Sequence, residues 1–190
     1  MTSTSSNKPA LRRLADGITL ARGALGLPLL AALSLGWGWF AWGLLLLGGI
    51  SDAADGWLAR RAGGGSPWGA QLDPLTDKIL ISAPLLWLAA NGSLPLWAVW
   101  LLLARELLIS GWRSGQGSGG PASLGGKAKT ILQFASLLLL LWPGAAAPQL
   151  HSLGWWLFWP GLGLALSSAW GYVQSASSAL KSEGAGGRRA

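Results

Sequence analysis

Four of the seven acidic residues in this 190-residue chain fall within one stretch, "SDAADGWLARRAGGGSPWGAQLDPLTDK", at residues 51–78. Asp52 and Asp55 are three positions apart, and Asp73 and Asp77 are four apart, so each pair shares one face of a helix. Four carboxylates at close range repel one another unless a cation lies among them. Mg²⁺ binds a few carboxylates together with substrate phosphates, and two such ions suit phosphoryl displacement. The stretch therefore predicts a divalent metal site.

A simpler interpretation is that these aspartates only hydrate a loop. For Asp73 alone, which precedes Pro74 and suits a helix N-cap, that interpretation is the better one. Four carboxylates partly inside apolar segments are different, because a charge at the centre of a bilayer costs at least ~2.5 kcal/mol. Gly56 and Gly69 would let a phosphate or nucleotide approach the backbone closely, and Ala59 keeps this face small. We therefore expect a site for a phosphate-bearing substrate.

The elements that must position these residues are apolar. Hydrophobic residues make up 51% of the chain and charged residues only 11%, against about 25% charged in soluble domains. Six runs have the length and composition of membrane-spanning helices: residues 18–36, 38–58, 75–91, 95–113, 130–148 and 153–174. The sequence thus predicts an all-α integral membrane protein with six transmembrane helices, and it excludes a separate soluble domain.

The basic residues indicate how this protein lies in the membrane. All fourteen Lys and Arg residues fall in or beside alternate connectors, and the other three connectors contain none. Basic connectors are typically cytoplasmic, so both termini are expected in the cytoplasm. The net charge of +7 follows from this pattern and does not indicate nucleic-acid binding. We expect a cytoplasmic segment at residues 1–15, a catalytic membrane domain at 16–175 and a disordered cytoplasmic tail at 176–190.

Two further features of the composition are informative: the positions of the tryptophans and the absence of cysteine. Indole rings favour the headgroup level of a bilayer, which predicts an aromatic belt near the uncharged connectors. The expected belt consists of Trp37, Trp39, Trp42, Trp97, Trp100, Trp142, Trp155, Trp156 and Trp159. The chain has no cysteine, so disulfide and thiol chemistry are excluded.

The aspartates belong to a longer pattern. Asp52-x-x-Asp55-Gly56-x-x-Ala59-Arg60, eight residues, and then Gly69-x-x-x-Asp73-x-x-x-Asp77 resembles the signature of the CDP-alcohol phosphatidyltransferases. The resemblance implies the fold of that family, with six transmembrane helices, a homodimer, and an active site at the cytoplasmic face of a bacterial-type inner membrane. It also implies two Mg²⁺ or Mn²⁺ ions per site and CDP-diacylglycerol as a substrate.

The resemblance also implies roles for single residues. Asp52, Asp55 and Asp73 would ligate the metals, and Asp77 would complete the site and act as the general base. An acceptor hydroxyl, deprotonated by Asp77, would then attack the lipid-side phosphorus while CMP leaves. The residues expected to line the CDP pocket are Thr19, Gly56, Ala59, Arg60 and Gly69.

A second basic group indicates the acceptor. "LARELLISGWR" and "GGKAKTILQ" contain Arg105, Arg113, Lys127 and Lys129 on the predicted cytoplasmic side. A lone basic residue at a helix end is often only a snorkelling anchor, and that interpretation stays open for the two lysines. Arginine inside an apolar run, however, can bind a phosphate bidentately. The four residues are thus candidates for binding an acceptor that carries its own phosphate.

These motifs, with "LDPLTDK", resemble the branch of the family that joins CDP-diacylglycerol to sn-glycerol 3-phosphate. The chain departs from that branch at Asp16-x-x-Thr19-x-x-Arg22, where an Asn usually stands first, and in the glycine-rich segment Ser114–Gly126. Other functions remain as alternatives: CMP-forming cardiolipin synthesis with phosphatidylglycerol as acceptor, inositol-phosphate transfer, or cation transport by intramembrane aspartates.

Overall fold

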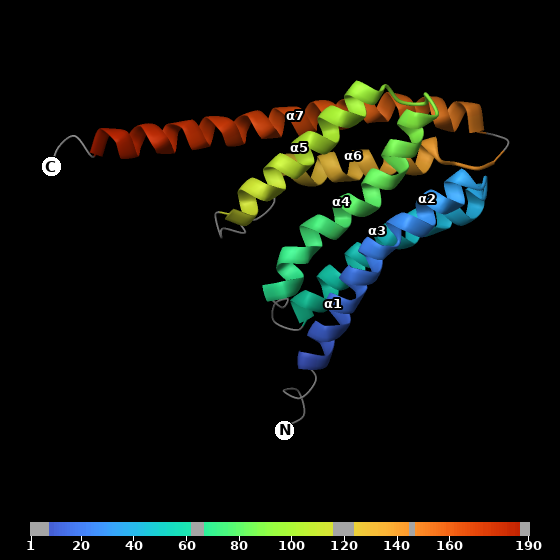
Figure 1. The fold of residues 1–190 in the computed structure, drawn as a ribbon, viewed down its shortest axis with the longest axis horizontal. Coiled ribbons are helices and arrows are strands. Elements are labelled where there is room, and N and C mark those ends of the chain that lie inside the picture. Colours follow the sequence, from blue (N-terminus) through green and yellow to red (C-terminus); the bar gives the residue numbers. More distant parts are fainter. Residues whose placement is uncertain (1–7, 62–66, 116–123, 145–146, 187–190) are drawn as a thin grey trace.

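The structure, a computed structural model, describes residues 8–61, 67–115, 124–144 and 147–186, with side chains for most of them (Figure 1). This part of the chain is helical and contains no strand. The helices are α1 (Lys8–Ala24), α2 (Gly26–Ser34), α3 (Gly38–Arg61), α4 (Pro67–Ala90), α5 (Leu96–Gly115), α6 (Leu124–Leu140) and α7 (Ala147–Gly186). The all-α prediction is confirmed for these residues.

The first expected helix is divided into α1 and α2. Proline lacks the N–H that would bond to the carbonyl four residues earlier, and its ring collides with that carbonyl. Pro28 therefore cannot donate a backbone hydrogen bond to the carbonyl of Ala24, the last residue of α1. The chain passes through Leu25, whose N–H still bonds to Ala21 O at 3.1 Å, so α2 follows α1 with only a bend.

Two helix boundaries differ from the sequence prediction. The N-cap role predicted for Asp73 is wrong: α4 begins at Pro67, so Asp73 lies inside the helix and Pro67 takes the first position, where a missing N–H costs nothing. At the other end, α7 continues to Gly186, into the tail for which we predicted disorder. Residues 176–186 include three alanines together with Leu180, Lys181 and Glu183, and these residue types favour helix.

Two turns reverse the chain at glycines. Gly36 and Gly92 have φ of 74° and 71°, a left-handed conformation that glycine adopts without strain. At the end of α4, Gly92 N–H bonds to Ala89 O and Ser93 N–H to Leu88 O, at 3.1 and 2.9 Å. This Schellman pattern satisfies the last carbonyls of the helix. The turn brings α5 back against α4.

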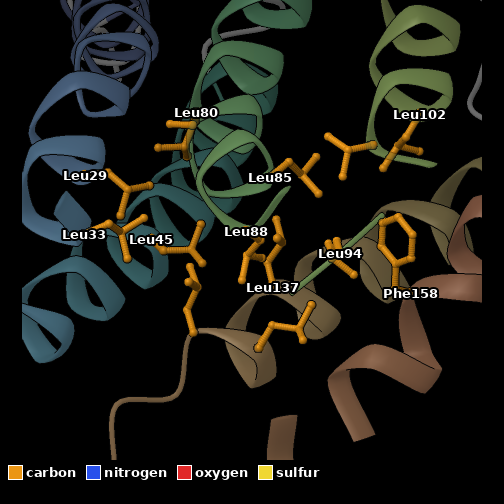
Figure 2. Packing of buried hydrophobic residues seen from close by; sticks show 14 of the residues in the cluster. Leu29, Leu33, Leu45, Leu80, Leu85, Leu88, Leu94, Leu102, Leu137 and Phe158 are labelled. Atoms are coloured by element: carbon orange, nitrogen blue, oxygen red, sulfur yellow. The ribbon is translucent and has the colours of Figure 1, made fainter. Parts of the chain in front are cut away.

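The helices pack in two connected groups. α3 runs back beside α1 and α2, α4 contacts all three of them, and α6 lies along α7 (Figure 1). α4 and α5 join the groups, since α5 packs on both α4 and α7. Leucines from α2, α3, α4 and α6 meet in the centre, among them Leu29, Leu45, Leu85 and Leu137 (Figure 2). This core fixes the helix ends that carry the acidic and basic residues.

Apolar side chains also cover much of the outside. Leu27, Leu108 and Ile131 are 77%, 72% and 67% exposed. Among the described residues, one helical segment, Ala10–Ser34, is long and apolar enough to cross a membrane. Only 33% of its most apolar stretch is buried within the protein. An outward-facing apolar surface of this kind suits contact with lipid. The number of six spans stays a prediction.

Candidate active site

The carboxylates of Asp52 and Asp77 lie against one guanidinium. Arg22 of α1 places Nη1 2.9 Å from Asp52 Oδ1 and Nε 2.9 Å from Asp77 Oδ1. Its Nη2 also donates to Thr76 Oγ1 at 3.5 Å. α1, α3 and α4 thus each contribute a charged side chain to one cluster, which we call the aspartate cluster.

Small residues bring these three helices together. A Cβ added to Gly23 would lie 2.8 Å from Thr76 Cγ2, and one added to Gly26 would lie 3.3 Å from Ile79 O. A Cβ on Gly48 of α3 would collide with the side chain of Leu80. Close approach at such positions is the usual way in which small residues permit tight packing of membrane helices. It is this contact of α1 with α4 that carries Arg22 to Asp77.

Burial in the aspartate cluster is uneven. Arg22 is 1% exposed, whereas Asp52 and Asp77 are 51% and 36% exposed. The cation therefore lies beneath the two carboxylates, and both carboxylates keep an open side. Removing a charge from water is costly unless it is paired, so this pairing explains why a buried arginine is tolerated here.

The other two aspartates of the predicted quartet have side chains outside the described residues. In the helices themselves, Asp55 is three positions after Asp52 in α3, and Asp73 is four positions before Asp77 in α4. Among the described side chains, no three carboxylates or histidines form a group that could hold a metal ion. Convergence of all four carboxylates stays a prediction. The oxygen-only donor set and its open side suit a hard divalent cation such as Mg²⁺.

A cavity of about 410 Å³ opens beside the aspartate cluster between α3, α4, α5 and α6. The charged residues that line it are Arg22, Asp52, Asp77, Lys78, Glu106 and Lys129. Its remaining wall is mostly apolar and includes Leu80, Ile81, Leu85, Leu102, Leu103, Phe134 and Leu138. Cavities of this size bind small molecules. A cavity lined by both charged residues and leucines suits a substrate that is both ionic and apolar.

Arg105, Glu106 and Lys129 form a second charged cluster, which we call the basic cluster; Glu106 and Lys129 line the cavity. Glu106 Oε1 accepts from Arg105 Nη1 at 2.8 Å and from Lys129 Nζ at 2.6 Å. Arg105 also donates to Ala165 O and to Ser168 Oγ of α7, at 2.8 and 2.6 Å. This cluster ties α5 to both α6 and α7.

The remaining predicted site residues are placed as follows. Thr19 is 5% exposed, and its Oγ1 donates to Ala15 O in its own helix at 3.1 Å. Gly56 is half-buried in α3, after Asp52. The predictions that lie outside the described side chains are Asp55, Ala59, Arg60, Gly69, Asp73, Arg113 and Lys127.

Sequence reasoning did not assign three residues that the structure brings to the site. These residues are Arg22, Thr76 and Glu106, which occur in the quoted motifs but had no predicted role in the site. A signal existed for Arg22 and Glu106, because ionisable residues inside apolar segments are functional by default. For Thr76, the only signal was its place directly before Asp77.

The amino-acid sequence is similar to those of known proteins. The sequence pattern of the CDP-alcohol phosphatidyltransferases matches residues 12–167. A protein of Mycobacterium tuberculosis named as a probable phosphatidylglycerophosphate synthase is 36% identical over 146 residues, covering 73% of this chain and 70% of that protein. The CDP-diacylglycerol–glycerol-3-phosphate 3-phosphatidyltransferase of Bacillus subtilis is 31% identical over 150 residues, covering 73% of this chain and 74% of the enzyme.

A second activity occurs among the relatives. A protein of Mycobacterium bovis named as a cardiolipin synthase is 34% identical over 140 residues, covering 68% of this chain and 65% of that protein. The relatives of this chain therefore carry the names of two different activities. Because the pattern extends over most of the chain, this protein is an enzyme of the membrane-embedded CDP-alcohol phosphatidyltransferase family, similar to phosphatidylglycerophosphate synthases.

Proposed function

We propose that this enzyme transfers the phosphatidyl group of CDP-diacylglycerol to sn-glycerol 3-phosphate, giving phosphatidylglycerophosphate and CMP. The observation that carries the proposal is one cavity that is lined by Asp52 and Asp77, by Lys129 and by leucines. The relatives named for this reaction support the choice of acceptor. Both substrates carry phosphate, and one also carries acyl chains, so they need charged groups and an apolar wall together.

The aspartates are proposed to form the metal site, with Asp52, Asp55 and Asp73 as ligands and Asp77 completing the site. Members of this family use divalent metals, and two Mg²⁺ or Mn²⁺ ions bound here would neutralise the diphosphate and stabilise CMP as it leaves. Arg22 holds Asp52 and Asp77 from beneath, through the two 2.9 Å contacts. The two carboxylates are thereby oriented before substrate arrives, which lowers the cost of ordering them during the reaction.

The reaction then needs one proton transfer. Asp77 accepts the proton of the acceptor hydroxyl, the hydroxyl oxygen forms a bond to the lipid-side phosphorus, and the bond from that phosphorus to the CMP oxygen breaks. Asp77 suits this role because its carboxylate lines the cavity and is 36% exposed. Residues proposed to surround the CDP group are Thr19, Gly56, Ala59, Arg60 and Gly69.

The acceptor's own phosphate is proposed to bind on the opposite side of the cavity. Lys129 lines that wall, and Arg105, Arg113 and Lys127 are the other candidates from the sequence. Phosphate binds well to basic groups that are withdrawn from bulk water, and the side chain of Lys129 is only 9% exposed. An acceptor held there would lie between Lys129 and Asp77.

The acceptor can be tested directly. Purified enzyme with CDP-diacylglycerol and Mg²⁺ or Mn²⁺ would be given radiolabelled sn-glycerol 3-phosphate or radiolabelled phosphatidylglycerol. We expect labelled lipid and CMP from glycerol 3-phosphate. Product from phosphatidylglycerol alone would replace our proposal with cardiolipin synthesis, the second candidate, which the relative from Mycobacterium bovis supports.

We also propose that the chain crosses the membrane six times, with both termini and the active site on the cytoplasmic side, and that it forms a homodimer. The chain has no native cysteine, so single cysteines can be introduced for labelling in intact cells. Ser93→Cys, in the α4–α5 turn, should react with a membrane-impermeant maleimide from outside. Ser114→Cys should react only after the cells are opened, and the reverse pattern would invert the topology.

A further inference from the structure

Arg105 is held by α7 and by its own neighbour. Its Nε donates to Ala165 O at 2.8 Å and its Nη2 to Ser168 Oγ at 2.6 Å. Its Nη1 donates to Glu106 at 2.8 Å, and the side chain is 9% exposed. All three guanidinium nitrogens are thus directed at protein groups. Arg105 is also absent from the described residues that line the cavity, whereas Glu106 and Lys129 both line it.

Glu106 connects Arg105 to the cavity. The same oxygen, Oε1, accepts from Arg105 and from Lys129, and the carboxylate is only 17% exposed. A lysine side chain has a long, flexible stem and loses entropy when its ammonium is fixed. A carboxylate that is itself fixed can hold that ammonium in one position. The contacts therefore form a chain from α7 through Arg105 and Glu106 to Lys129.

We propose that Arg105 is a positioning residue and not a ligand of the acceptor's phosphate: it anchors Glu106 to α7, and Glu106 holds Lys129 where the phosphate binds. This inference rests on the proposed function and assigns separate tasks to basic residues that the sequence grouped together. It predicts that contacts on α7, outside the cavity, control the affinity for the acceptor. Binding of CDP-diacylglycerol depends on the other side of the cavity and should not change.

The first experiment measures KM for the acceptor, KM for CDP-diacylglycerol and kcat in Arg105→Gln, Glu106→Gln and the double variant. Each single change should raise the acceptor KM roughly tenfold, the usual effect of losing one charged hydrogen bond. The KM for CDP-diacylglycerol should stay within about twofold. Because both residues act through Lys129, the double variant should be no worse than the poorer single variant. Effects that multiply would show that Arg105 acts on its own, and they would overturn the proposal.

The second experiment uses a smaller change, in case the first variants fold poorly. Ser168→Ala removes one partner of Arg105 and should raise the acceptor KM by about threefold. Ser167→Ala is its matched control: the neighbouring hydroxyl bonds only within α7, to Leu164 O, and is exposed. Its acceptor KM should equal that of the wild type. A wild-type acceptor KM in Ser168→Ala would overturn the proposal, because the anchor on α7 would then have no role.

The two proposals can fail separately. All variants are measured with the acceptor that the wild type uses in the two-acceptor assay. Use of phosphatidylglycerol would contradict the proposed acceptor, and the Arg105–Glu106 coupling would still be decided with that lipid, whose headgroup also carries a phosphate. Use of glycerol 3-phosphate with multiplicative effects would support the function and overturn only the positioning role.

Discussion

The two charged clusters beside the cavity are built with opposite polarity. In the aspartate cluster, a buried cation lies beneath two partly exposed carboxylates: Arg22 is 1% exposed and Asp52 is 51% exposed. In the basic cluster, Glu106 lies between two cations, Arg105 and Lys129, that are each 9% exposed. The first cluster therefore offers negative charge to the cavity, and the second supplies an ammonium held by a carboxylate.

This difference suggests how one cavity can hold two anionic substrates. Metal ions and the diphosphate require carboxylates with an open side, which Asp52 and Asp77 provide. The acceptor's phosphate requires a basic group, which Lys129 of α6 provides in the same cavity. In the aspartate cluster, the oppositely charged Arg22 is more buried than the carboxylates that it orients. In the basic cluster, Glu106 is 17% exposed and lines the cavity beside Lys129. Substitutions should therefore have different effects on the two sides.

The largest effect is expected from Asp77→Asn. The amide keeps the size of the side chain but cannot take up the hydroxyl proton, so kcat should fall by about 10²–10⁴-fold. Binding of CDP-diacylglycerol should be retained at a metal concentration that saturates the weakened site. Turnover can be followed as CMP release, and binding by equilibrium measurement with labelled CDP-diacylglycerol. Full turnover in this variant would remove Asp77 as the base.

A smaller effect is expected from Arg22→Gln, measured as thermal unfolding in detergent. Without the guanidinium, the two carboxylates lose the cation that they share, which should lower the unfolding free energy by about 2 kcal/mol in EDTA. Mg²⁺ should restore part of this loss, because a bound cation replaces the missing charge. Equal destabilisation with and without Mg²⁺ would show that Arg22 and the metal do not share the aspartates.

The smallest effect is expected from Gly23→Ala. The added Cβ would lie 2.8 Å from Thr76 Cγ2, so α1 must move away from α4 at a cost of about 1 kcal/mol. Gly17→Ala is the matched control in the same helix, because nothing lies within 4 Å of its added Cβ. The control should be neutral or stabilising, since alanine favours helix over glycine. A higher melting temperature for Gly23→Ala than for the wild type would contradict tight α1–α4 packing.

The sequence predicted the helices well because apolar runs define them. The run 38–58 corresponds to α3 at Gly38–Arg61, and the run 75–91 lies almost entirely within α4 at Pro67–Ala90. The predicted helix boundaries were less accurate near prolines, because a proline can either begin a helix or interrupt one. Pro74 was taken as the start of a helix that Pro67 begins, and the break that Pro28 introduces near Leu25 was not foreseen.

The candidate site was predicted only in part, because its pairings join distant segments. Asp52 and Asp77 followed from a local motif, but their contact with Arg22 depends on how closely Gly23 lets α1 approach α4. Likewise, nothing in the spacing of "LARELLIS" indicates that Arg105 bonds to α7, sixty residues later. Local patterns identify the reactive groups, and tertiary packing decides which of them meet.

The most direct test of the central claim is Mn²⁺ binding followed by electron paramagnetic resonance, without substrate or turnover. Titrations would compare the wild type with Asp52→Asn, Asp77→Asn and Glu106→Gln. We predict that each aspartate variant weakens Mn²⁺ binding at least tenfold, whereas Glu106→Gln binds as tightly as the wild type. Wild-type affinity in both aspartate variants, or a loss in Glu106→Gln alone, would contradict the assignment of the metals to the aspartate cluster.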